Sequence, residues 1–190
     1  TKKIILTQTQ NQMSKFFLKT ADFKRAIKND HLSAITSNDN TIQNDACLAS
    51  QTEIESYLRG KYDLNKLFPV IIDWNISSAF AIGAIVYDAA TSAFYTAQSE
   101  IVASTLITDE QWLKGDPRDP LIVEFMLDLT LYRIHARVAP NQIPETRIQR
   151  RDDAISFLTK VAKYSITVGW DQSTEVLPAS INYGSNTKEE

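Results

Sequence analysis

Three stretches of the chain carry hydrophobic residues at the spacing of an α-helix. In residues 41–59 the apolar positions form one stripe near the 3.6-residue period, and Gly60 follows as a helix stop. Residues 121–138 are apolar on almost every side, which predicts a buried central helix. Residues 145–164 return to the one-sided pattern of an amphipathic helix. The pattern therefore predicts a small helical bundle with a long central helix.

The helical pattern is interrupted between residues 69 and 120. Two short runs, GAIVYD at 83–88 and SAFYTAQ at 92–98, are rich in β-forming residues and predict a hairpin. Gly83 stands at the start of the first run, where a bend or bulge is expected. Residues 108–120 predict a short turn of helix and then an exit bounded by prolines. We therefore expect a small β-rich insertion between two helices.

Both ends of the chain are polar. Residues 1–19 are rich in Gln, Thr and Lys, and predict an extended arm that buries Phe16, Phe17 and Leu18 against another surface. Residues 171–190 carry a net charge of −3 and predict an extended tail. The expected fold class is mainly α, a small helical bundle with a β-rich insertion and extended terminal arms. Its predicted parts are an N-terminal arm at 1–19, a helical domain at 20–68 and 121–168, an insertion at 69–120 and a tail at 171–190.

Charge is distributed unevenly along a chain of ordinary composition. The 190 residues are 43% hydrophobic and 23% charged, with a formal charge of −3, so general coating of nucleic acid is not expected. Residues 1–28 hold seven Lys or Arg and one Asp, which leaves −9 on the rest. A basic arm ahead of an acidic body is typical of contact with an acidic partner or nucleic acid, and equally of a solvated terminus. No apolar run approaches the roughly 18 residues of a membrane span, and no signal peptide is expected.

The sequence lacks the common motifs of catalysis and cofactor binding. Its five glycines form no phosphate-binding loop, and HExxH, GxSxG and CxxC are all missing. Cys47 lies on the apolar stripe of its helix, which favours a small buried residue over a nucleophile. His135 lies near a helix C-terminus, where it favours a contact with the helix dipole or a neighbour. We therefore expect no enzyme activity, cofactor or metal.

Three arginines at the start of the last helix are the main candidates for contacts with other molecules. Arg147, Arg150 and Arg151 lie where a helix dipole does not favour cations, which suggests an acidic partner outside the chain. Pairing with nearby acids of the same helix is an equally good interpretation. Those acids are Glu145, Asp152 and Asp153.

The aromatic residues of the insertion allow two interpretations. They can line a sugar-binding face, or they can form the minimal core of the insertion, which we favour. These residues are Tyr87, Phe94, Tyr95 and Trp112.

Two blocks of sequence resemble a known family. ASQTEIESYLRGKYDL at 49–64 resembles the first helix of small head–tail connector proteins of tailed bacteriophages. DPRDPLIVEFMLDLTLYRIHARVAPNQIPETRIQRRDDAISFLTKVAKYSITV at 116–168 is similar to the second block of that family, in the Mu-like branch of head-completion or adaptor proteins. The two blocks occur in the family's order.

This resemblance implies a structural virion protein. Its copies, about twelve, would form a ring between the portal protein and the tail or a further ring, after synthesis in the host cytoplasm. The ring would extend the channel through which genomic DNA passes without sequence-specific binding, with no catalysis or cofactor. The alternative is a ligand- or glycan-binding adaptor that uses the insertion. Expected subunit or portal contacts are Arg147, Arg150, Arg151, Phe16 and Phe17. Expected channel-facing residues are Glu53 and Glu55, on the exposed side of the first long helix.

Overall fold

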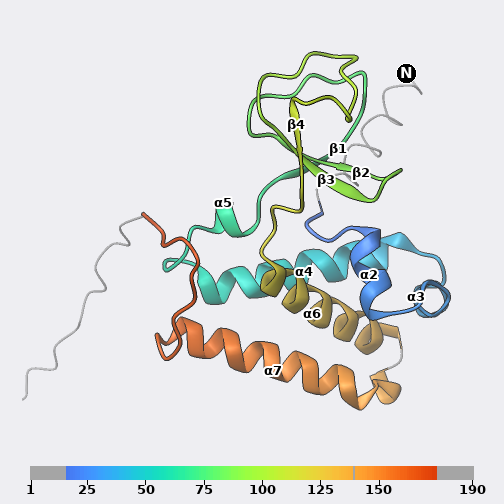
Figure 1. The fold of residues 1–190 in the computed structure, drawn as a ribbon. Coiled ribbons are helices and arrows are strands. Elements are labelled where there is room, and N and C mark those ends of the chain that lie inside the picture. The colour runs from blue at the N-terminus through green and yellow to red at the C-terminus, as the bar shows by residue number, and fades with distance from the viewer. Residues whose placement is uncertain (1–15, 139, 175–190) are drawn as a thin grey trace, which may run out of the picture.

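The computed structural model describes residues 16–138 and 140–174, and confirms a mainly α fold with a small β insertion (Figure 1). About half of the described residues are helical, and the strands all lie between α5 and α6. The helices are α2 (Thr20–Ala26), α3 (Asn29–Thr36), α4 (Asn40–Leu58), α5 (Leu64–Leu67), α6 (Pro120–Val138) and α7 (Glu145–Ala162), with a 3-10 turn at Pro140–Gln142.

Helix α6 is the centre of the bundle, as its apolar sequence predicts. The side chains of Met126, Leu131 and Ile134 are completely buried. Helices α4 and α7 both contact α6 and also contact each other, so that Ile54 of α4 and Leu158 of α7 reach the same core. The apolar stripes of the two outer helices therefore close over the central one.

The boundaries of α4 follow from its capping residues. The Asp39 carboxylate accepts a hydrogen bond from the Thr41 backbone N–H at 2.8 Å, which satisfies one free donor of the first turn. At the other end Gly60 adopts a φ of 80°, in the left-handed region that favours glycine. The predicted helix at 41–59 is thus confirmed with a shift of one residue at each end.

The insertion contains a sheet with the strand order β1-β2-β3-β4. The predicted hairpin is confirmed, because β2 and β3 pair antiparallel with Tyr87 opposite Phe94. The Asp88 carboxylate accepts hydrogen bonds from the Ala90 and Thr91 backbone N–H groups and so stabilises the turn. Strand β1 pairs parallel to β2, and β4 pairs antiparallel to β3. The strands are β1 (Ile71–Asp73), β2 (Ile85–Asp88), β3 (Ala93–Ala97) and β4 (Trp112–Lys114).

The prediction of a helical turn in residues 108–120 is wrong, because this segment contains β4. Trp112 lies opposite Ala97 of β3 and is buried, and Leu113 lies opposite Thr96. Local sequence favoured a turn, but pairing with β3 and burial of the indole ring outweigh that preference.

The two faces of the sheet belong to different cores. One face places Ile71, Tyr87 and Phe94 in the main core beside the helices. The opposite face carries Val86, Tyr95 and Trp112, which are covered by Phe80 and Ile101 from the loops and form a second, smaller core. In Figure 1 the sheet lies on one side of α4 and α6, and α7 lies on the other side. The insertion therefore has packing of its own and stands on the helical bundle.

The first described residues are part of the main core, which corrects the expectation for the N-terminal arm. Phe17 and Leu18 are 3% and 4% exposed, and the Phe17 ring lies 5.2 Å from the Phe68 ring. They are therefore buried in their own chain rather than against another molecule. The remainder of the predicted arm, residues 1–15, and of the predicted tail, residues 175–190, lies outside the described residues.

The start of the predicted tail is attached to the bundle. The Trp170 indole N–H donates to the Asp119 carboxylate at 2.9 Å, and its ring contacts Tyr62 edge-on. The Asp171 carbonyl accepts from the Asp63 backbone N–H at 2.9 Å. The chain that follows α7 is thus held against the loop after α4.

We predict that Leu158→Ala lowers the free energy of unfolding by about 3 kcal/mol, since it leaves a cavity at a fully buried position. Leu48→Ala is the matched control, because this α4 side chain is 59% exposed and should be nearly neutral. Chemical denaturation of both variants checks the prediction. Equal losses of stability would contradict the assignment of α7 to the core.

Candidate functional site

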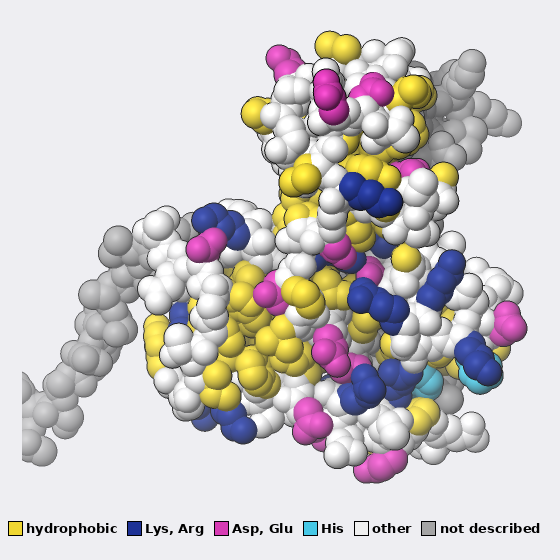
Figure 2. Space-filling model, in the orientation of Figure 1, with side chains coloured by type: hydrophobic (Ala, Val, Ile, Leu, Met, Phe, Trp, Pro, Cys, Tyr) yellow, Lys and Arg dark blue, Asp and Glu magenta, His cyan; other side chains and the backbone are white. Residues whose placement is uncertain are grey.

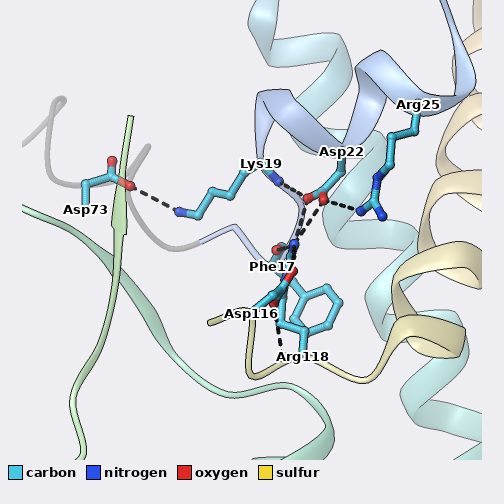
Figure 3. Close-up of polar contacts among 7 residues, drawn as sticks. All are labelled: Phe17, Lys19, Asp22, Arg25, Asp73, Asp116 and Arg118. Carbon is cyan, nitrogen blue, oxygen red and sulfur yellow. Dashed lines mark hydrogen bonds and ion pairs between the residues drawn. The ribbon is translucent and has the colours of Figure 1, made fainter. Parts of the chain in front are cut away.

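The insertion, α2 and the N-terminal segment meet at a buried ion cluster around Arg118 (Figure 3). The Arg118 side chain is 0% exposed. Its guanidinium donates to the Asp22 carboxylate at 2.7 and 2.9 Å, to the Asp116 carboxylate at 2.7 and 2.9 Å, and to the Phe17 carbonyl at 2.7 Å. These contacts use all five N–H donors of the group. We call Phe17, Lys19, Asp22, Asp73, Asp116 and Arg118 the junction cluster.

Asp22 connects this arginine to the start of α2. Its carboxylate accepts a hydrogen bond from the Lys19 backbone N–H at 2.7 Å and another from Arg25 at 2.7 Å. The Lys19 ammonium reaches across to Asp73 of β1 at 3.1 Å. The Arg118 guanidinium also lies 4.1 Å from the centre of the Phe94 ring of β3. The cluster therefore joins α2, the sheet and the loop that enters α6.

The charges of the cluster stabilise one another. Burial alone would raise the pKa of Asp22, but the hydrogen bonds and positive charge of Arg118 outweigh it, and the pKa lies below its usual value. Burial would lower the pKa of Arg118, and its bonds to Asp116 and Asp22 instead raise it. Burial lowers the pKa of Lys19, against the opposing effect of Asp73. Asp22 and Arg118 thus remain charged in the interior.

A second feature is a groove between α2, α6 and α7, which we call the arginine groove. It encloses about 560 Å³. The Arg147 guanidinium donates to the Ala26 carbonyl of α2 at 2.6 Å, and Arg150 lies 3.5 Å from the Asp128 carboxylate of α6. The lining residues are Arg25, Ala26, Pro120, Val123, Glu124, Leu127, Asp128, Thr146, Arg147 and Arg150.

The groove is a partly desolvated environment. Burial raises the pKa of Asp128, and the charge of Arg150 only partly opposes this effect. Burial also lowers the pKa of Arg147, against the attraction of Asp128. Among the described residues, no carboxylate forms an ion pair with Arg147, so its charge is only partly compensated in the chain.

The three candidate arginines make contacts within their own chain. Arg151 donates to Asp152 at 2.8 Å and lies over the Tyr132 ring, which confirms one of the pairings proposed from sequence. Arg147 and Arg150 instead contact α2 and α6, elements that sequence spacing did not connect to them. A role of the three in contacts with other molecules stays a prediction.

The expectation that Glu53 and Glu55 share an exposed side of α4 is wrong. Residues two apart on a helix point in different directions, and both side chains are half-buried. Glu53 accepts a hydrogen bond from Arg133 of α6, and Glu55 accepts one from Gln51 at 2.7 Å. Their role in a channel stays a prediction, now without a common surface to support it.

Two further sets of candidates are the phenylalanines of the N-terminal segment and the aromatic residues of the insertion. Phe17 is buried in the main core and is not accessible to another subunit, whereas Phe16 is half-buried. The four aromatic residues of the insertion are 6% or 7% exposed, so they form no stacking face for a sugar. Tyr95 and Trp112 belong to the insertion's own core, and Tyr87 and Phe94 to the main core.

Cys47 and His135 have the structural environments that the sequence predicts. Burial raises the pKa of the Cys47 thiol to about 12, which disfavours the reactive thiolate at neutral pH. The His135 Nδ1 atom lies 2.7 Å from the Leu131 carbonyl oxygen of its own helix. In residues 16–138 and 140–174, no group of His, Cys, Asp and Glu has an arrangement that could hold a metal ion. Within the same ranges no helix is long and apolar enough to cross a membrane.

Part of the sequence is similar to a known protein family. A family described as "Bacteriophage Mu, Gp36" matches residues 116–185, a segment that begins at the junction cluster and includes α6 and α7. This similarity supports a bacteriophage protein. No curated protein and no solved structure matches the chain.

The junction cluster predicts a large effect of removing one charge. Asp22→Asn removes one of the two carboxylates that pair with the buried Arg118 guanidinium, and should lower the free energy of unfolding at pH 7 by about 3 kcal/mol. Because the folded pKa of Asp22 lies below the usual 3.8, its stabilisation is complete above pH 3.8 and is lost as the pH falls through the folded value. The difference from wild type should therefore shrink below pH 3.8, as measured by denaturation across pH. The control is Asp171→Asn, which breaks an exposed ion pair with Lys66 and should change little.

Replacing Asp128 should have the opposite effect on stability at pH 7. Because burial raises its folded pKa above the usual 3.8, the charged form opposes folding above that pH. Asp128→Asn should therefore make the protein more stable at pH 7, and the gain should vanish once the pH falls below 3.8. Thermal unfolding of both proteins at several pH values measures this, and a loss of stability at pH 7 would mean that the Arg150 ion pair dominates.

Proposed function

We propose that this protein is a structural component of a tailed-phage particle, whose copies form a ring between the portal and the tail and extend the DNA channel. The similarity of residues 116–185 to the bacteriophage Mu family is the observation that carries this proposal. The resemblance of residues 49–64 and 116–168 to head–tail connector proteins supports the finer assignment.

The shape of the subunit suits a ring component. Each subunit of a ring contacts its two neighbours through two different surfaces. The ring closes only if the angle between these two surfaces is the same in every subunit. The junction cluster holds the sheet to the bundle through Arg118, whose side chain is buried and whose donors are all used. The insertion can therefore serve as a rigid projection, rather than as a domain on a flexible linker.

The overall charge is compatible with a DNA channel. With −3 on each chain, a ring of about twelve copies would carry a charge of about −36. A negative surface repels the phosphate backbone, so that DNA would pass without adhering to the wall. Basic side chains such as Arg147 would then contact protein rather than DNA.

The ring proposal predicts an effect of the arginines on assembly. Replacing Arg147, Arg150 and Arg151 by Ala should raise the concentration needed for assembly at least tenfold, because arginine forks pair well with carboxylates at interfaces. Circular dichroism should show that the subunit remains folded. Analytical ultracentrifugation of the purified full chain measures the assembly.

The matched control is Lys160→Ala with Lys163→Ala, which removes exposed positive charges at the other end of α7. This variant should assemble as the wild type does. A wild-type chain that remains monomeric at all concentrations, and in the presence of portal protein, would refute the ring. Normal assembly of the triple variant would show that the arginines are ordinary surface charges.

A further inference from the structure

We infer that the acidic end of the insertion of one copy docks into the arginine groove of the next copy. This inference rests on the proposed ring and identifies the contact that builds it. The end of the insertion carries only acidic charges, the groove carries exposed arginines, and the two surfaces lie on different parts of the subunit.

The end of the insertion carries both acidic side chains and exposed aliphatic side chains. Residues 75–113 contain no Lys or Arg, and the loops beyond the sheet carry Glu100, Asp109 and Glu110, all of them exposed. Figure 2 shows acidic side chains at the top of the insertion, with hydrophobic side chains among them. The exposed aliphatic side chains of these loops are Ile76, Ile82, Val102 and Leu106.

Within the described part of their own chain, these side chains contribute little to packing or ion pairing. Ile82 and Val102 are 70% and 69% exposed and do not belong to the second core, although their sequence neighbours Ala81, Gly83 and Ile101 adjoin or enter it. In the described part of the chain, neither Glu100 nor Glu110 forms an ion pair or a side-chain hydrogen bond. Exposed aliphatic groups between uncompensated carboxylates are typical of a surface that another protein covers.

The arginine groove has the complementary character. Arg25 and Arg150 are 63% and 55% exposed at the groove, and Arg147 has no carboxylate partner among the described residues. Val123 and Leu127 also line the groove, but they are only 4% and 6% exposed, so its accessible surface is mainly that of the arginines. Figure 2 shows basic side chains gathered on the helical part of the molecule, away from the acidic end of the insertion. A carboxylate that enters the groove would gain the charged hydrogen bonds that Arg147 lacks.

The arrangement within the subunit favours contact between copies. The sheet and α7 lie on opposite sides of α4 and α6, and the loops of the insertion lie at its end away from the helices (Figure 1). No residue of these loops lines the groove of its own chain. A contact between two different surfaces of identical subunits is a head-to-tail contact, which closes into a ring when the rotation allows. The rigid junction cluster sets that rotation.

A nucleic acid fits the groove less well than an acidic protein surface does. Glu124 and Asp128 also line it and oppose phosphates and carboxylates alike; beside the three arginines they leave a net charge of about +1, which suits a few carboxylates better than a long polyanion. Val123 and Leu127 do not separate the two ligands, because they are 4% and 6% exposed and offer little apolar contact to either. Binding of DNA is therefore retained as an outcome of the test and not as the proposal.

Charge reversal of each surface, followed by mixing, tests the contact. The groove variant is Arg147→Glu with Arg150→Glu, and the insertion variant is Glu100→Lys with Glu110→Lys. For each variant alone, the protein concentration needed for assembly should be at least tenfold higher than for the wild type. Analytical ultracentrifugation of the full chain measures this concentration. An equimolar mixture should assemble again, because the acidic groove of one variant then meets the basic insertion of the other.

Two controls accompany the mixture. Lys160→Glu with Lys163→Glu makes the same charge change on the exposed far end of α7 and should leave assembly intact. Arg147 contacts Ala26, so the single variant Arg150→Glu is measured as well, in case the double variant fails to fold. Restored assembly in the mixture would itself show that both variants are folded.

The remaining outcomes separate the inference from the proposed ring. If the wild type forms rings and the reversals do not affect them, or if the mixture of folded variants fails to assemble, the contact lies elsewhere and the inference is overturned while the ring stands. If the wild type never assembles, the ring and the inference both fail. If the groove variant loses affinity for double-stranded DNA in a mobility-shift assay but assembles normally, the groove is a nucleic-acid site.

Discussion

The burial of one arginine determines how the parts of this molecule are connected. A guanidinium without access to water must have a counter-ion and a partner for every N–H group, because an unpaired buried charge costs several kcal/mol. Arg118 finds these partners in Asp22 of α2, Asp116 of the loop after β4 and the Phe17 carbonyl. The N-terminal segment, the insertion and α6 can therefore meet only in an arrangement that brings those groups together.

This constraint has consequences for the surface. With the sheet on one side of α4 and α6, the loops of the insertion point away from the bundle (Figure 1). No residue of these loops lines the groove between α2, α6 and α7. Asp22 also receives a hydrogen bond from Arg25, which is itself a lining residue of the groove. The junction cluster thus connects the position of the insertion to one wall of the groove. A subunit with two separated and complementary surfaces is what a head-to-tail assembly needs.

The parts of the fold that sequence predicts are those governed by local pattern. The apolar run that became α6, the stripes of α4 and α7 and the hairpin of β2 and β3 all follow from periodicity. Strand β4 does not, because its three residues are a strand only through pairing with β3. The burial of Phe17 in its own chain was not predicted, because the ring that it contacts, Phe68, is 51 residues away in the sequence. The Asp22–Arg118 pair spans 96 residues, and no local signal connects the two positions. The candidate arginines were identified by their unfavourable place at a helix start, but only the structure shows that Arg147 and Arg150 line a groove with α2.

The most direct test of this account is electron cryo-microscopy of the assembled full chain. The account predicts a ring in which the loop carrying Glu100 and Glu110 of each copy lies against Arg147 and Arg150 of its neighbour. A ring whose insertions point into solvent, with the groove open or filled by another element, would contradict it.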